Sequence, residues 1–213
     1  MQIRLQQVSP DFIEEEKISG SQVWRSGLAF DKGEKVQIIA PSGSGKTSLI
    51  HFLYGLRKDY QGDIICKEKN LKVFDAEELA RYRRQVVSIV FQDMRLFTGQ
   101  TVLQNLEIKR QLHPFHPESR IVEMADRLGI GSKLNKPCAT CSYGEQQRIA
   151  IVRALQQPFD FLLLDEPFSH LDDRNRKLAM GLMEEETASR NAAIILADLK
   201  PLDFFKPDRS LNL

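Results

Sequence analysis

Residues 40–48 read APSGSGKTS and lie between a short apolar run and a stretch with apolar residues at helical spacing. Their spacing is that of the phosphate-binding loop G-x-x-x-x-G-K-[ST], with Ala40 in place of the first glycine. Glycines at positions 43 and 45 allow the backbone to turn so that successive N–H groups face one concavity, and the following helix adds the positive end of its dipole. A glycine and serine loop that only caps a helix would not require Lys46 and Thr47. The segment therefore predicts a nucleoside triphosphate site.

The chemistry expected of this loop follows from its side chains. Lys46 would reach the terminal phosphates, and the Thr47 hydroxyl would ligate Mg²⁺. The residues of the loop predicted to bind the nucleotide are Ser42, Gly43, Ser44, Gly45, Lys46, Thr47 and Ser48.

A second segment, FLLLDEP at residues 161–167, reads as a buried strand that ends in two carboxylates. In phosphate-loop proteins a strand of this kind carries the aspartate that reaches Mg²⁺, and Asp165 takes that place. Glu166, the next residue, could orient or deprotonate an attacking water as a general base. Alone, the two acids are equally compatible with the start of a turn before Pro167. The phosphate-binding loop makes the catalytic interpretation the stronger one.

The order of elements predicts an α/β fold with a mainly parallel core sheet, because strands alternate with helices. Predicted strands cover residues 1–8, 34–40, 86–91, 161–165 and 192–197. Predicted helices cover residues 46–56, 74–85, 101–134 (with breaks at Pro114 and Pro117), 144–157 and 172–190. We expect a single domain of residues 1–213, with a core of about 1–92 and 158–213 and a helical subdomain of about 93–157.

Composition excludes some classes of function. The net charge of +1 gives no overall attraction to nucleic acid or to an anionic membrane, so we expect no nucleic-acid partner. The longest apolar runs are too short to cross a bilayer, and the N-terminus lacks the apolar core of a signal peptide. The sequence thus predicts a cytoplasmic protein whose membrane role would come through a partner.

The three cysteines are an odd number, as expected of reduced thiols. Cys138 and Cys141 form a C-x-x-C, but a zinc site normally needs four ligands and no second pair is visible. We therefore expect no metal or redox role for this pair.

Taken together, five segments carry a family resemblance: APSGSGKTS, FQD (residues 91–93), CSYGEQQR (residues 141–148), LLLDEPFSHLDD and a final strand. Their order and spacing resemble those of ABC-type ATPase domains, over essentially the whole chain. The resemblance implies a phosphate-loop core with a mainly parallel sheet, an antiparallel β subdomain and an inserted helical subdomain. It implies ATP and Mg²⁺ as ligands, and ATPase activity.

The resemblance also implies a head-to-tail dimer with two ATP molecules at the interface. Gln92 is similar to the glutamine that touches Mg²⁺ and senses the membrane partner, which makes it a catalytic and metal candidate beside Glu166. Ser142 and Gly144 match the signature that approaches the γ-phosphate of the other subunit, and Asp172 matches an aspartate across the dimer. Phe12 lies roughly where an aromatic residue stacks on adenine.

Each of these positions has a simpler interpretation. Gln92 is also compatible with an ordinary polar residue at a strand end, and Phe12 with a core residue. Ser142 and Glu145 fit a capping box, S-x-x-E, that starts a helix without any nucleotide.

Within the family, the chain is most similar to the small ATPases of lipoprotein-release, macrolide-export and cell-division complexes. That similarity implies two ATPase subunits, as a homodimer or a heterodimer, beneath integral-membrane permease subunits contacted through the helical subdomain. It places the protein on the inner face of the cell membrane. An ABC-type ATPase acting on DNA or ribosomes fits less well, because such proteins usually carry insertions or a duplicated domain.

Three positions depart from the family pattern. Cys141 replaces a leucine, which changes packing only, and Tyr143 replaces the first signature glycine, where a side chain would crowd the partner's γ-phosphate unless it swings aside. Asp198 stands where the family has a histidine that hydrogen-bonds the γ-phosphate and the attacking water. An ionised aspartate cannot donate a hydrogen bond and would repel the phosphate. We expect ATP hydrolysis to be retained but weakened; the alternative is an ATP-gated dimerisation switch, or a degenerate subunit, with little or no turnover.

Overall fold

The structure is a computed structural model that describes residues 1–213. The strands are β1 (Gln2–Pro10), β2 (Gly27–Asp31), β3 (Lys35–Ile39), β4 (Tyr60–Cys66), β5 (Lys69–Asn70), β6 (Val87–Val90), β7 (Phe161–Asp165), β8 (Ala193–Asp198) and β9 (Arg209–Asn212). The α-helices are α1 (Glu15–Ser19), α2 (Lys46–Leu53), α3 (Ala76–Gln85), α4 (Val102–Leu112), α5 (Glu118–Arg127), α6 (Tyr143–Ala154) and α7 (Asp173–Arg190). Three short 3₁₀ turns cover Leu71–Val73, Gly131–Lys133 and Cys138–Thr140.

The core sheet has five strands in the order β6-β7-β8-β3-β9, and every neighbouring pair is parallel. A parallel pair needs a crossover connection, which the alternating helices supply. The predicted α/β fold with a mainly parallel core sheet is therefore confirmed.

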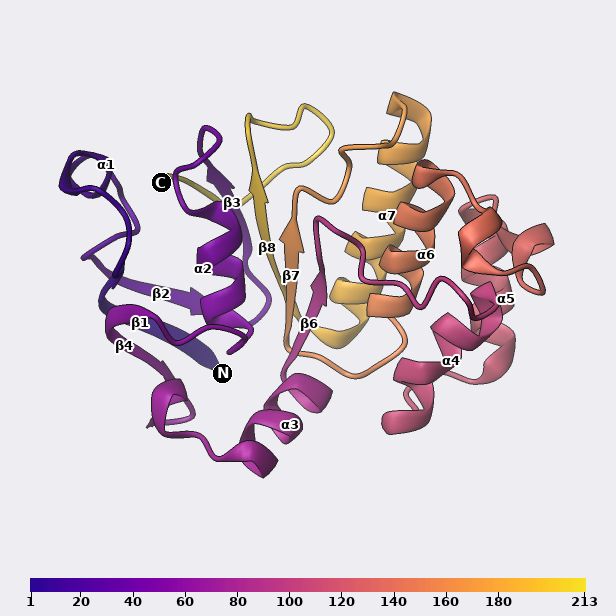
Figure 1. The fold of residues 1–213 in the computed structure, drawn as a ribbon, viewed down its shortest axis with the longest axis horizontal. Coiled ribbons are helices and arrows are strands. Elements are labelled where there is room, and N and C mark those ends of the chain that lie inside the picture. Colours follow the sequence, from indigo (N-terminus) through magenta and orange to yellow (C-terminus); the bar gives the residue numbers. More distant parts are fainter.

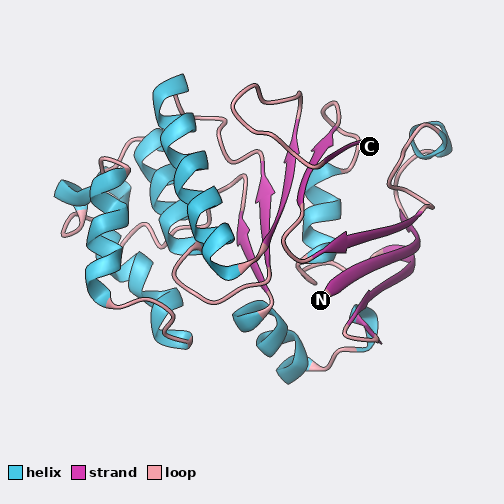
Figure 2. Ribbon diagram, turned by 180° about the vertical axis from the view of Figure 1, so that it is seen from behind, coloured by secondary structure: helices cyan, strands magenta, loops and turns pink.

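Both faces of this sheet are buried, as the continuous apolar runs of its strands require. Along β7, Phe161 and Leu163 pack into one apolar cluster, whereas Leu162 and Leu164 pack into the other. Helix α2 covers the first face, between the two sheets, and α6 and α7 cover the second (Figure 1). The view from behind shows the same three layers (Figure 2).

The second sheet is antiparallel, with the order β2-β1-β4-β5. It packs against α2 through residues such as Ile3, Leu5 and Phe30, which share one cluster with Phe52 and Leu53 of the helix. The antiparallel β subdomain predicted from the family resemblance is thus present.

Helices α4, α5 and α6 lie together on the side of the core sheet away from the antiparallel strands (Figure 1). The predicted breaks at Pro114 and Pro117 separate α4 from α5, since proline removes a backbone donor. Thr101 caps α4 and Ser142 caps α6, each in a reciprocal capping box with the residue three positions later. The predicted division into a core and a helical subdomain of about residues 93–157 stays a prediction in its bounds.

Sequence patterns located the long helices and strands β1, β3, β6, β7 and β8 to within a few residues. They gave no range for strands β2, β4, β5 and β9, or for the five-residue helix α1, whose only buried residue is Ile18. None of the helices has both the length and the apolar character needed to cross a membrane.

Candidate nucleotide site

The candidate site lies at one edge of the core sheet, where parallel strands present their carboxyl ends. Four strands end there: β3 runs into the loop at residues 40–45, β6 precedes Gln92, β7 ends at Asp165, and β8 ends at Asp198. Ligands of open α/β sheets bind outside the carboxyl ends of the strands. The fold therefore gathers residues that lie up to 158 positions apart in sequence.

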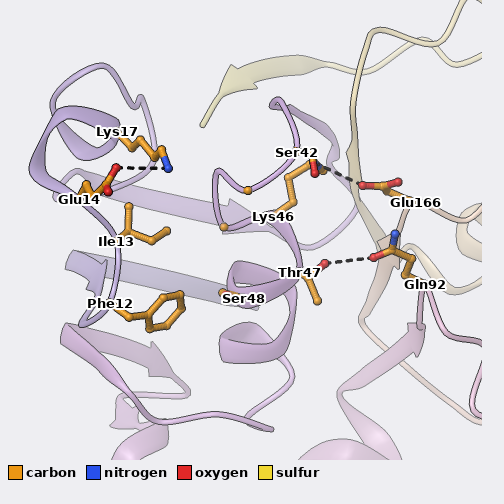
Figure 3. A pocket seen from close by; sticks show the side chains of 12 residues that line it. Phe12, Ile13, Glu14, Lys17, Ser42, Lys46, Thr47, Ser48, Gln92 and Glu166 are labelled. Carbon is orange, nitrogen blue, oxygen red and sulfur yellow. Dashed lines mark hydrogen bonds and ion pairs between the residues drawn. The ribbon is translucent and has the colours of Figure 1, made fainter.

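A cleft of about 370 Å³ opens at this edge (Figure 3). The residues that line it are Phe12, Ile13, Glu14, Lys17, Ser42, Gly43, Gly45, Lys46, Thr47, Ser48, Gln92 and Glu166. Nine of these were predicted from the sequence as nucleotide-binding, metal-binding or catalytic residues. Ile13, Glu14 and Lys17 were not.

The loop takes its shape from backbone conformations that favour glycine. Gly45 has φ of 99°, and a Cβ atom there would lie 2.6 Å from Cδ1 of Ile13 and 3.0 Å from Cζ2 of Trp24. Gly43 has φ of 78° with open space around it. Glycine is therefore required at position 45 for two reasons, the left-handed backbone and the close approach of Ile13 and Trp24. At position 43 only the left-handed backbone requires it. Ala40, the departure from the usual glycine, is buried where the loop leaves β3.

Lys46 is held inside the loop. Its side chain is 4% exposed, and Nζ donates to the carbonyl oxygens of Ala40 and Pro41 at 3.0 Å each. Nζ also lies 3.4 Å from Oε1 of Glu166, an ion pair drawn in Figure 3. An ammonium at this depth places a full positive charge against the cleft, beside the N-terminus of α2.

The residues predicted to hold Mg²⁺ converge. Oγ1 of Thr47 lies 3.2 Å from Oδ1 of Asp165 and 3.5 Å from Oε1 of Gln92. The Asp165 side chain is fully buried, and its Oδ2 has no hydrogen-bond partner. Burial raises the pKa of Asp165 to about 6, with the hydrogen bond from Thr47 opposing the rise and the charge of Glu166 adding to it. A buried carboxylate oxygen without a partner, beside hydroxyl and amide oxygens, fits a hard divalent cation.

Glu166 has a strained backbone, with φ of 44°. Its N–H donates to Ala197 O at 2.9 Å, and its own carbonyl accepts from Nε2 of the buried Gln147 at 3.4 Å. Left-handed backbone at a non-glycine residue costs about 1–3 kcal/mol and tends to occur at functional sites. Here the conformation turns the carboxylate out of the line of β7 and into the cleft. Gln147, which supports this turn, was not recognised in the sequence.

The other end of the cleft is formed by residues 12–17. The ring of Phe12 is 52% exposed, so it does not belong to the core, and the guanidinium of Arg57 lies 4.6 Å from its centroid. Glu14 and Lys17 pair at 3.4 Å. An exposed aromatic ring at this end is suited to stacking on a base. The only sequence signal for its neighbours was their position directly after Phe12.

Four predicted nucleotide-binding residues do not line the cleft. Ser44 is buried, and its hydroxyl donates to the carbonyl of Pro41 at 2.8 Å. Ser142 and Asp172 are exposed helix caps, of α6 and α7. Gly144 is the second residue of α6, where a Cβ would come within 2.9 Å of His170 O. The simpler interpretation of Ser142 as a cap is correct, and it leaves the hydroxyl at the surface.

Tyr143, which replaces a signature glycine, is 68% exposed. Its ring stacks on His170 with centroids 5.4 Å apart and planes inclined by 22°. The side chain is thus folded sideways onto its own subunit.

Asp198 lies beside the cleft, in a neighbouring hollow that shares Glu166 with it. Its Oδ1 accepts a hydrogen bond from the N–H of Leu199 at 2.7 Å. Burial raises the pKa of Asp198, and the nearby charge of Glu166 acts in the same direction, while the Leu199 bond, Lys46 and Arg176 oppose them.

Cys138 and Cys141 are buried free thiols. Burial raises the pKa of both, for Cys138 to about 11. No group of three or more metal-ligating His, Cys, Asp or Glu side chains exists in the structure. Both side chains belong to the apolar cluster on the helical side of the core sheet.

This geometry defines a nucleotide-binding domain of the phosphate-loop class. A sequence profile described as "ABC transporter" matches residues 25–169, more than half of the chain. The chain belongs to the ABC transporter family, as an ATPase domain of it.

Known relatives support the same family. The lipoprotein-releasing system ATP-binding protein LolD of Legionella pneumophila (strain Lens) is 33% identical over 172 residues, which cover 79% of this chain and 76% of LolD. An uncharacterized ABC transporter ATP-binding protein, YvcR of Bacillus subtilis (strain 168), is 34% identical over 79% of this chain and 66% of YvcR. The macrolide export ATP-binding/permease protein MacB of Nitrosomonas europaea is 34% identical over 77% of this chain but only 25% of MacB. The predicted similarity to this group is confirmed.

Solved structures share the fold. MJ0796, a bacterial ABC transporter cassette solved as a dimer, has a TM-score of 0.80 at 24% identity, over 93% of this chain and 88% of the other. A putative ABC transporter ATP-binding protein from Pyrococcus furiosus has a TM-score of 0.77 at 17% identity, over 100% and 98% of the two chains.

Proposed function

We propose that the protein binds MgATP in this cleft and hydrolyses it at a head-to-tail dimer interface, as the ATPase subunit of a membrane transport or related mechanical complex. One observation carries the proposal: Lys46, Thr47 and Glu166 line one cleft at the edge of the core sheet, and buried Asp165 lies directly behind it, 3.2 Å from Thr47 Oγ1.

Triphosphate binding follows from the loop. Lys46 would exchange its two carbonyl acceptors for phosphate oxygens, a stronger charge-assisted interaction. Loop amides from Ser42 to Ser48 and the dipole of α2 would hold the rest of the phosphate charge. At the far end of the cleft, Phe12 would stack on adenine.

Mg²⁺ would be held by Thr47, Asp165 and Gln92, with Asp165 supplying the oxygen that has no partner in the protein. When bound, the ion would neutralise charge that develops on the phosphates during hydrolysis.

Glu166 is the group proposed to activate the attacking water. Its carboxylate lines the cleft 3.4 Å from the ammonium of Lys46, so it faces the place where the terminal phosphate would lie. A positioned general base contributes typically about 10²–10⁴-fold in rate. Gln92, in the cleft, and Asp198, in the neighbouring hollow, complete the proposed catalytic set.

A second subunit would complete the site. Ser142, Gly144 and Asp172 lie outside the cleft, and the first and last of these are exposed, so we assign them to the nucleotide held by another copy or by a related chain. The dimeric cassette MJ0796 has the same fold. Homodimer and heterodimer are both compatible with this arrangement.

A permease is the proposed membrane partner, contacted through the helical subdomain of about residues 93–157. Phe97, Leu112, Phe115 and Val122 present exposed apolar side chains there, at 41–56% exposure. The protein would then be cytoplasmic and peripheral on the inner face of the membrane. LolD and MacB are named for such transport systems.

Dimer formation is tested by light scattering with MgATP, using Glu166→Gln so that the nucleotide is not consumed. The proposal expects the mass to double with ATP and to remain that of a monomer when Lys46→Ala is added. If Glu166→Gln binds ATP but its molar mass stays that of a monomer, the homodimer is contradicted.

The alternative function is an ATP-gated switch with little turnover, and Asp198 is the observation that favours it. Losing one donor to the transition state costs on the order of 10²–10³ in kcat. If Asp198 has removed such a donor, Asp198→His should raise kcat by about that factor. If hydrolysis is intact, Asp198→His should change kcat little.

A further inference from the structure

Beside the cleft lies a second hollow of about 400 Å³. Its charged and polar lining consists of Glu166, Ser169, Arg176, Asp198 and Lys200. Since Glu166 lines both spaces, any change of charge in the cleft acts directly on this hollow.

Arg176, near the start of α7, is a cation without a close hydrogen-bond or ion-pair partner. Its Nε is buried without a hydrogen-bond partner. Its one ion pair is a long contact of 3.6 Å with Asp173, whose side chain is 90% exposed. An exposed pair of this kind contributes little, so Arg176 is free to take a better acceptor.

Two carboxylates line this hollow: Glu166, which pairs with Lys46, and Asp198, which has no ion-pair partner. One carboxylate oxygen of Asp198 is occupied by the N–H of Leu199, and no side chain of the protein donates to the other. The positive charge of Arg176 already acts on Asp198 and lowers its pKa, against the larger effect of burial. The two side chains do not form an ion pair in this structure.

Triphosphate binding would change the balance of positive and negative charge around Asp198. Lys46 is the other cation whose charge favours ionised Asp198, and it is the group that would turn to the phosphates. Glu166 and Asp198 would then face each other and several phosphate charges. Of the two remaining cations in the hollow, Lys200 is exposed, whereas Arg176 is partly buried with a free donor.

We propose that Arg176 is a positioning residue for hydrolysis: it pairs with Asp198 when a triphosphate fills the cleft, and holds that carboxylate away from the phosphates. The pair makes an aspartate tolerable at position 198. The proposal rests on the proposed function, and it explains how hydrolysis survives the loss of a histidine there.

A double-mutant cycle tests the pair through kcat for MgATP hydrolysis. Arg176→Gln should lower kcat about tenfold, the size of coupling expected between side chains in contact, with little change in KM. Arg176→Lys should restore part of the loss, and in an Asp198→Asn background Arg176→Gln should have almost no effect. Arg174→Gln is the matched control, because Arg174 is exposed on the same helix and makes no ion pair.

A second readout does not depend on turnover. With ¹³C-labelled aspartate carboxyls, Mg²⁺ and a non-hydrolysable ATP analogue, NMR follows the pKa of Asp198, assigned by the signal missing in Asp198→Asn. Arg176→Gln should raise this pKa, and Arg174→Gln and Lys200→Gln should not. Lys46 and Glu166, the other charged groups facing Asp198, are unchanged in all three variants.

An equal loss of kcat in both backgrounds, an unchanged Asp198 pKa, or a larger effect from Lys200→Gln would overturn the pair. A wild-type protein that binds the analogue without hydrolysing ATP would instead contradict the proposed function. In that case the titration alone still supports or overturns the pairing.

Discussion

Asp165→Asn should stabilise the protein in the absence of Mg²⁺ and nucleotide. The wild-type carboxylate is fully buried, with one oxygen unpaired, and its pKa is about 6 against an ordinary 3.8. At ~1.4 kcal/mol per pH unit, this difference corresponds to about 3 kcal/mol of destabilisation at neutral pH. Asparagine keeps the acceptor for Thr47 and removes the charge.

The sign follows from proton binding. Because the folded protein holds the Asp165 proton more tightly than the unfolded chain does, stability falls as pH rises from about 4 to about 6. Asp165→Asn removes this fall. For a chain of this size, 1 kcal/mol shifts Tm by about 2–4 °C, so the variant should melt about 6–12 °C higher at pH 7.5.

Thermal melts in EDTA at pH 7.5 and at pH 4.5 provide the assay, with the acidic series as internal control. The difference in Tm should narrow at pH 4.5, where folded wild type carries the proton, and MgATP should stabilise wild type far more than the variant. A variant that melts at or below wild type at pH 7.5 would refute the electrostatic reasoning about this carboxylate.

Two further changes test the loop and the buried charges. Gly45→Ala should lower both Tm and ATP affinity more than Gly43→Ala does. Both variants introduce a side chain at positive φ, but only the new Cβ at position 45 contacts Ile13 and Trp24. Equal decreases in Tm for the two variants would contradict this steric effect. Glu186→Gln should destabilise by about 3–5 kcal/mol, because it leaves Arg190 buried without its partner. Burial alone would raise the pKa of Glu186, but hydrogen bonds from His116, Arg120 and Arg190 outweigh it and lower the pKa to about 2. The stabilisation of the folded protein by ionised Glu186 is therefore present above about pH 4.5 and is lost as the pH falls toward 2. Thermal melts at pH 7 compare Glu186→Gln with Glu185→Gln. The second variant should lower Tm little, because the carboxylate of Glu185 is half-exposed.

The sequence predicted those parts of the fold that local patterns encode. Alternating strands and helices gave the parallel sheet, and the spacing around residues 40–48 placed the loop at the end of β3. The short helix α1 was not predicted, because five residues with one buried side chain show no helical periodicity of apolar residues. Ile13 and Glu14, just before this helix, and Lys17, within it, were missed for the same reason.

Other features depend on contacts between distant segments, which no single stretch of sequence records. Ser44 has the right position in the motif, yet its side chain turns into the loop toward Pro41. Gln147 looks like any polar residue of a helix until the fold places its amide against the strained turn at Glu166. The fold likewise brings Arg176 and Asp198 to one hollow from two different elements.

We propose that this cleft hydrolyses ATP with Glu166 as the base. The most direct test of this proposal is steady-state hydrolysis of MgATP by the purified protein beside Glu166→Gln. We expect measurable turnover for wild type and a loss of about a hundredfold or more in the variant, with ATP binding retained. Equal turnover in the two proteins, or binding without turnover in wild type, would contradict it.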